Sequence, residues 1–123
     1  LPGNQLPAAT LTTQAITRAG VTPAYVAAAP GGDACEVGDD IYLHAQNTSG
    51  TSVTVTLAIP SSASTYPNVA YTNTTVVVPI TTGDKLVGPI SALYKDPTTG
   101  LCTITTSAQP AGFTYACFKL QAP

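Results

Sequence analysis

The chain contains a single histidine, His44, so any chemistry that needs an imidazole depends on this residue. A hydrolase needs a nucleophile beside a base, and a zinc site needs three or four ligands. His44 alternates with Tyr42 and Gln46 on the polar side of an expected strand, which favours an exposed or interface histidine. The sequence has none of the common hydrolase, nucleotide-binding or zinc-protease motifs. We therefore expect no enzymatic activity and no cofactor.

Four carboxylates fall close together, at Asp33, Glu36, Asp39 and Asp40. Calcium prefers oxygen ligands of this kind, but the spacing matches no EF-hand loop. Aspartate also caps turns through its own backbone hydrogen bonds. Turn or capping roles are the preferred interpretation, and a calcium site is the alternative.

The chain has three cysteines, Cys35, Cys102 and Cys117, and an odd count argues against a disulfide scaffold. Cys102 and Cys117 could face each other across the last predicted hairpin, where the pairing would place Ile104 opposite Tyr115. Buried reduced thiols that pack as small hydrophobic residues are the preferred interpretation, and a disulfide is the alternative.

The elements that position these residues are predicted to be strands, and the clearest pattern covers residues 41–60. Apolar and polar residues alternate there on both sides of a short polar turn, as in half-buried strands. A turn with Gly50 in the left-handed conformation would close a hairpin and pair Leu43 with Val55. A shift of one residue would turn half of the apolar side chains to water, so the pattern predicts this register.

Length and composition predict one all-β domain. The chain has 123 residues, 21 of them threonine, with 11 prolines and 10 glycines spread along it. These features favour many short strands separated by turns, because threonine suits extended backbone. We predict an antiparallel β-sandwich or jelly-roll-like barrel of about eight short strands over residues 16–123. Residues 1–15 are uncharged and contain Pro2 and Pro7, which predicts an extended N-terminal arm that lies on another surface.

The charge of the chain is low. Only 8% of the residues are charged and the net charge is −2, with four lysines and arginines in total. No basic patch is present to neutralise phosphates, so nucleic acid and anionic membranes are not expected partners. No apolar run is long enough to span a bilayer.

Several segments together resemble one family. They are ITRAGVTPAYVAA at 16–28, GGD at 31–33, IYLHAQNTSGTSVTVTLAIP at 41–60, VVPITTGDKLVGPI at 77–90 and YKDPTTGLCTITTS at 94–107. In this order they resemble the capsid decoration or cement proteins of tailed bacteriophages, especially phages of actinobacteria. The similarity covers most of the chain beyond the first fifteen residues.

The resemblance implies a non-enzymatic structural protein on the outer capsid surface of a virion, assembled in the bacterial cytoplasm. Its partners would be the major capsid protein, which it would bridge and stabilise, and other copies of itself, with a trimer as one option. The apolar residues of the arm are the predicted capsid contacts: Leu1, Pro2, Leu6, Pro7, Leu11 and Ile16.

Two alternatives remain open from the sequence. One is a secreted β-sandwich module that binds carbohydrate or an adhesive surface. Its candidate contacts are the tyrosines, although the absence of tryptophan weakens sugar stacking. The other is a tail or head-completion component of a virion. The six tyrosines are Tyr25, Tyr42, Tyr66, Tyr71, Tyr94 and Tyr115.

Overall fold

The computed structural model describes residues 9–60 and 73–120. Over these residues it contains ten strands, of which two have only two residues, and a short 3-10 helix, η2. The eight longer strands agree with the predicted number. No helix in the described part could cross a membrane. The elements are β1 Ala9–Thr10, β2 Thr13–Ile16, β3 Val26–Ala27, β4 Asp33–Cys35, β5 Ile41–Asn47, β6 Val53–Leu57, β7 Thr74–Val78, β8 Gly83–Val87, η2 Ala92–Tyr94, β9 Cys102–Thr106 and β10 Phe113–Leu120.

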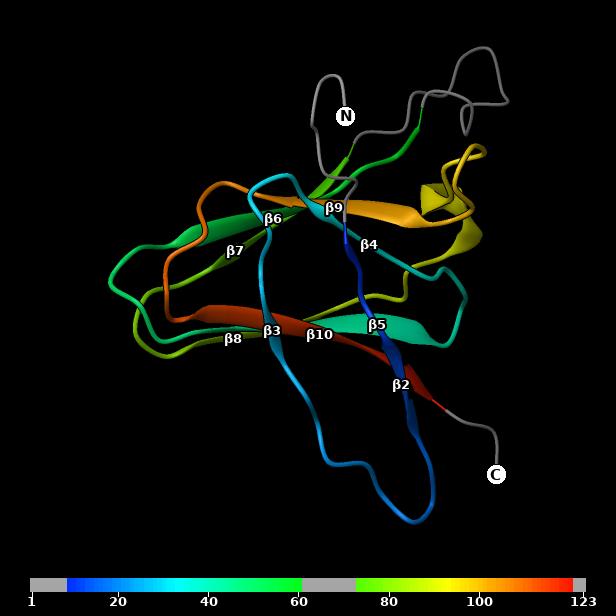
Figure 1. Cartoon of the computed structure of the whole chain (residues 1–123), viewed down its shortest axis with the longest axis horizontal. Coiled ribbons are helices and arrows are strands. Elements are labelled where there is room, and N and C mark those ends of the chain that lie inside the picture. Colours follow the sequence, from blue (N-terminus) through cyan, green and yellow to red (C-terminus); the bar gives the residue numbers. More distant parts are fainter. Residues whose placement is uncertain (1–8, 61–72, 121–123) are drawn as a thin grey trace, which may run out of the picture.

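The strands form two sheets that pack face to face as two layers (Figure 1). Sheet A has the order β1-β4-β9-β6-β7, and sheet B has the order β2-β10-β5-β8. In sheet B, β3 also pairs with β10. The pairs are antiparallel except β1 with β4 and β2 with β10, which are parallel. The structure thus confirms the prediction of an all-β sandwich.

Alternation of side chains explains which residues form the core. Along β5 every second residue, beginning with Ile41, is buried, and β6 shows the same pattern from Val53. The intervening side chains point outward, because successive residues of a strand face opposite sides of its sheet. Both strands therefore turn their apolar residues towards the space between the sheets.

The predicted hairpin over residues 41–60 is wrong, because its two strands lie in different sheets. Leu43 pairs with Cys117 of β10, and Val55 pairs with Val76 of β7. Gly50 is also not among the residues with positive φ, so the expected left-handed turn is absent. The chain crosses from sheet B to sheet A at this point. The two apolar faces then meet across the core, which buries the same residues that a hairpin would bury.

Asn47 holds this crossing together. Its side chain is fully buried, and Nδ2 donates to the carbonyl of Thr51 at 2.8 Å and to that of Val78 at 3.3 Å. Its Oδ1 accepts a hydrogen bond from the backbone N–H of Ser49 at 3.0 Å. Since Val78 belongs to sheet A, the amide bridges the two sheets.

The predicted last hairpin is wrong for the same reason, because β9 lies in sheet A and β10 in sheet B. Ile104 pairs with Asp33, not with Tyr115. The three cysteines are buried free thiols, which confirms the interpretation as reduced core residues. Hydrogen bonding to the other two thiols, followed by burial, raises the pKa of Cys35.

The predicted boundary of the N-terminal arm is wrong, because residues 9–15 belong to the sandwich. The chain runs from β1 in sheet A to β2 in sheet B, and Leu11 between them lies in the core with 6% of its surface exposed. The segment from β3 to β4 makes the opposite crossing. Figure 1 shows both crossings running across the two layers beside each other, so they close one side of the sandwich.

Candidate functional site

The outer face of sheet B carries an aromatic groove of about 410 Å³. Tyr42, Leu86 and Phe118 point outward from three neighbouring strands, β5, β8 and β10, because they alternate with core residues. β2 and the loop that follows it form the remaining side of the groove. The lining residues are Ile16, Val21, Pro23, Tyr25, Tyr42, His44, Leu86 and Phe118.

The loop between β2 and β3 projects beyond sheet B (Figure 1). Its tip is a turn in which Gly20 N–H donates to Thr17 O at 2.9 Å, with φ of 90° at Gly20. At its base the Gln14 side chain makes two hydrogen bonds of 2.8 Å to the backbone of Ala24, one as donor and one as acceptor. These contacts fix the position of Tyr25 over the sheet.

Aromatic rings form the floor of the groove. The Phe118 ring stacks on Tyr42 with 5.8 Å between centroids, and it meets Tyr25 edge to face at 6.2 Å. Tyr25 also meets the His44 ring edge to face at 5.4 Å. Such pairs stabilise the rings by about 0.5–1.5 kcal/mol beyond the burial of their surface.

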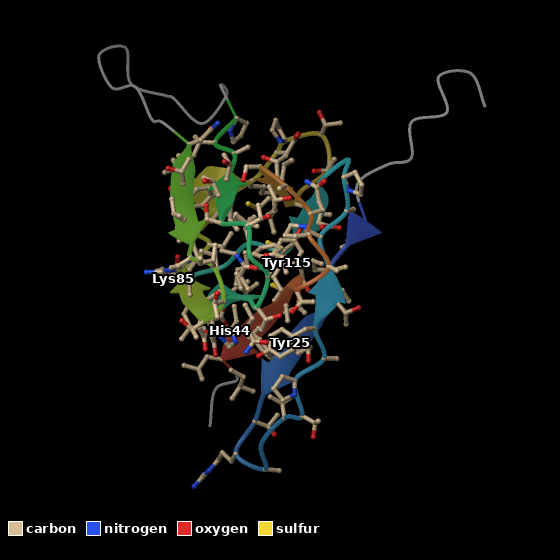
Figure 2. All side chains as sticks on the ribbon, turned by 90° about the vertical axis from the view of Figure 1, so that its left-hand side faces the viewer. Tyr25, His44, Lys85 and Tyr115 are labelled. Atoms are coloured by element: carbon tan, nitrogen blue, oxygen red, sulfur yellow. The ribbon has the colours of Figure 1, made fainter. Side chains whose placement is uncertain are left out.

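Three polar groups meet at one wall of the groove. The Tyr25 hydroxyl lies 2.7 Å from His44 Nδ1, and His44 Nε2 contacts the Asp84 carboxylate. Figure 2 shows Tyr25 and His44 beside each other. Burial, followed by the negative charge of Asp84, raises the pKa of Tyr25, so its hydroxyl stays protonated and can donate to Nδ1. One neutral imidazole tautomer, with its proton on Nε2, then satisfies all three groups.

The lining of the groove is mainly apolar. Its described lining contains no serine, threonine, cysteine or lysine, which are the usual nucleophiles. One carboxylate, Asp84, reaches His44, and more than half of its side chain is exposed. The raised pKa of Tyr25 disfavours a phenolate nucleophile. The groove thus offers apolar contact surface with two or three hydrogen-bonding groups, as ligand sites commonly do.

A second groove of about 380 Å³ lies beside the first and shares Tyr42 and Leu86 with it. Leu86 is 67% exposed, and Leu120 in the second groove is 60% exposed. Together the grooves make a continuous apolar surface, which we call the sheet B face. Contiguous exposed apolar surface of this kind typically marks an interaction site.

The predicted contact residues separate into three groups. Leu1, Pro2, Leu6 and Pro7 lie outside the described residues. Leu11 is buried in the hydrophobic core of the domain. Ile16 lines the aromatic groove, so it lies on the surface that we identify from the structure.

The four carboxylates that cluster in the sequence differ in their burial. Asp33 is buried, whereas Glu36, Asp39 and Asp40 are exposed. Among residues 9–60 and 73–120, no group of three or more His, Cys, Asp or Glu side chains could hold a metal ion. The calcium alternative therefore gains no support from the described residues.

Two of the six tyrosines gather at the groove, namely Tyr25 and Tyr42. Tyr115 lies in the core, and Tyr66 and Tyr71 lie outside the described residues. Sequence reasoning did not identify Leu86 or Leu120 as surface contacts, nor Phe118, which is 4% exposed, as part of the groove floor. A signal was present for Phe118, because both faces of its strand are apolar, which marks a strand that is covered on each side.

Comparison with known proteins gives no match. No protein-family model matches the chain, and no curated protein or solved structure is significantly similar to it.

Proposed function

We propose that the protein is a non-enzymatic structural component of a virion that decorates the outside of a phage capsid. In this role it bridges neighbouring major capsid proteins and stabilises the shell. The family resemblance in five ordered segments supports the assignment. The low charge of the chain, with 8% charged residues, also suits a domain that is covered by a larger assembly.

The observation that carries the proposal is the sheet B face. Leu86 and Leu120 leave most of their surface exposed beside an aromatic groove. Burying each leucine against a partner contributes about 1.5–3 kcal/mol. When many copies bind one lattice, a modest area per contact is sufficient, because neighbouring sites reinforce one another.

The location and the copy number test this function directly. We expect quantitative mass spectrometry of purified virions to find hundreds of copies per particle, since a lattice decoration repeats with the capsomers. A dozen copies or fewer would instead identify a tail or head-completion component. Recovery only from the culture medium, free of particles, would contradict a virion role.

The sheet B face is tested with Leu86→Asp in a binding assay on capsids stripped of this protein. We expect binding to fall at least about tenfold, because the substitution removes apolar contact and buries a charge. The matched control is Val77→Asp, which changes an exposed residue (55%) on the edge strand of sheet A. Equal binding by both variants would show that attachment uses another surface.

The groove also favours one alternative, a secreted module that binds carbohydrate or an adhesive surface. Tyr25 and Tyr42 supply aromatic surface, and Asp84 and His44 supply polar groups beside it. Saturable binding of oligosaccharides in solution, lost in Tyr42→Ala, would support this alternative over a virion role.

A further inference from the structure

Asp33 is a buried carboxylate that forms no ion pair with a cation among the described residues. Its side chain is 2% exposed. All four lysines and arginines, Arg18, Lys85, Lys95 and Lys119, lie in the described part of the chain, and none of them forms an ion pair with Asp33. Buried carboxylates are normally paired with a cation or a metal, because burial removes their hydration. A cation from outside the described residues would supply a charged partner for Asp33.

Only one oxygen of the carboxylate is engaged. Oδ2 accepts hydrogen bonds from the backbone N–H of Ala29 at 3.1 Å and from the Tyr115 hydroxyl. Burial, followed by the hydrogen bond to Asp33, raises the pKa of Tyr115, so this hydroxyl remains a donor. Within the described residues, Oδ1 has no hydrogen-bond partner, yet it is not a buried unsatisfied atom. Asp33 lines an open space, and Oδ1 is its oxygen that remains for a further donor.

That space is a cavity of about 440 Å³ on the side of the sandwich that the two crossing segments close. Leu11 and Gln14 line it from the first crossing, and Val26 and Ala27 line it from the second. Asp33 of β4 and Tyr115 of β10 line the cavity from the two sheets. Tyr115 lies apart from the Tyr25–His44 pair (Figure 2), so this cavity is separate from the aromatic groove. Its lining combines apolar residues with the polar side chains of Thr10, Thr12 and Gln14 and with one carboxylate, Asp33.

We propose that this cavity binds an alkylammonium group, either a lysine side chain of a protein partner or a free alkylamine. The ammonium ion would donate to Asp33 Oδ1, and its alkyl chain would lie along Val26 and Leu11. One free oxygen suits a compact ammonium ion better than a guanidinium, whose paired donors favour both oxygens of a carboxylate. A metal ion would need more ligands than Asp33 alone provides.

The test is an NMR titration of the intact protein with butylamine at neutral pH, where the amine is protonated. The Ala29 amide reports directly, because its N–H donates to Asp33. We expect a saturable shift of this signal with butylamine and none with 1-butanol, which has the same alkyl chain without the charge. Equal responses to the two compounds would overturn the proposal.

Variants separate the cavity from general electrostatic attraction. Asp33→Asn keeps an acceptor for Tyr115 and removes the charge, so we expect affinity for butylamine to fall at least about tenfold. Asp96→Asn, which changes a half-buried turn residue, should bind as the unchanged protein does. If Asp33→Asn does not fold, Ala27→Phe serves instead, because it fills the cavity mouth and leaves Asp33 intact. Unchanged binding in the folded cavity variants would overturn the site.

A second ligand distinguishes the two sources of the amine. Nα-acetyl-lysine methylamide carries the lysine side chain in a peptide-like setting. Binding at least as tight as that of butylamine supports a lysine of a protein partner, whereas clearly weaker binding supports a free amine. Failure of both amines to bind would overturn the proposal, but it would leave the role of the sheet B face unaffected.

Discussion

Asn47 shows how one polar residue can decide the path of a strand. It ends β5 with its side chain buried, and it satisfies backbone groups of the crossing and of β7. The sequence pattern predicted a turn at this point but assigned the critical position to Gly50. Local pattern could not reveal that Asn47 bonds to Val78, because the two residues are 31 positions apart. The contacts of His44 with Tyr25 and Asp84 were hidden from sequence reasoning for the same reason.

Asn47→Ala should therefore lower the free energy of unfolding by about 2–3 kcal/mol, because it leaves buried backbone groups without partners. Urea denaturation monitored by fluorescence measures the change. Asn73→Ala is the control, since Asn73 is exposed and, among the described residues, it accepts one hydrogen bond, from Ile59 N–H. We expect it to cost less than about 1 kcal/mol. Equal losses would show that Asn47 does not hold the crossing.

At the scale of elements, period-two patterning identified β5 and β6 but not their relation. A hairpin and a crossing between sheets bury the same alternate residues, so the hydrophobic pattern cannot distinguish them. The same ambiguity explains the wrong pairing of β9 with β10. The loop between β2 and β3 was equally inaccessible, because its shape depends on the Gln14 side chain bonding to the backbone of Ala24.

The Gln14 contacts give a prediction for this loop. Gln14→Ala removes both hydrogen bonds at its base, so the loop should open more often. Trypsin cleavage after Arg18, near the loop tip, should then be about three- to tenfold faster. Gln109→Ala is the control, because within the part of the chain that the structure describes the Gln109 amide bonds only to nearby Thr106. A cleavage rate unaffected by Gln14→Ala would mean that the loop is held by other contacts.

For the whole molecule, composition and turn spacing were sufficient to predict an all-β sandwich. They could not place the apolar surface, because exposure of Leu86 and Leu120 depends on which sheet each strand joins. The arm was predicted too long for a related reason. An uncharged, proline-bearing segment looks independent in the sequence, yet residues 9–16 complete both sheets.

For residues 1–7 the extended arm stays a prediction, and it can be tested there. Replacing these residues with a Gly/Ser sequence of equal length should weaken attachment to capsids at least about tenfold, because two leucines are lost. The unfolding midpoint should not change, since the described strands begin at Ala9. Unaltered attachment would assign binding to the folded domain alone.

The parallel pairing of β2 with β10 has a mechanical consequence. The first long strand and the last strand lie side by side, in register from Thr13 and Cys117 to Ile16 and Leu120. Tension that pulls Thr13 and Leu120 in opposite directions acts along both strands, so their hydrogen bonds are sheared together and do not open one after another. A domain held at these two ends would therefore resist extension through this one pair of strands.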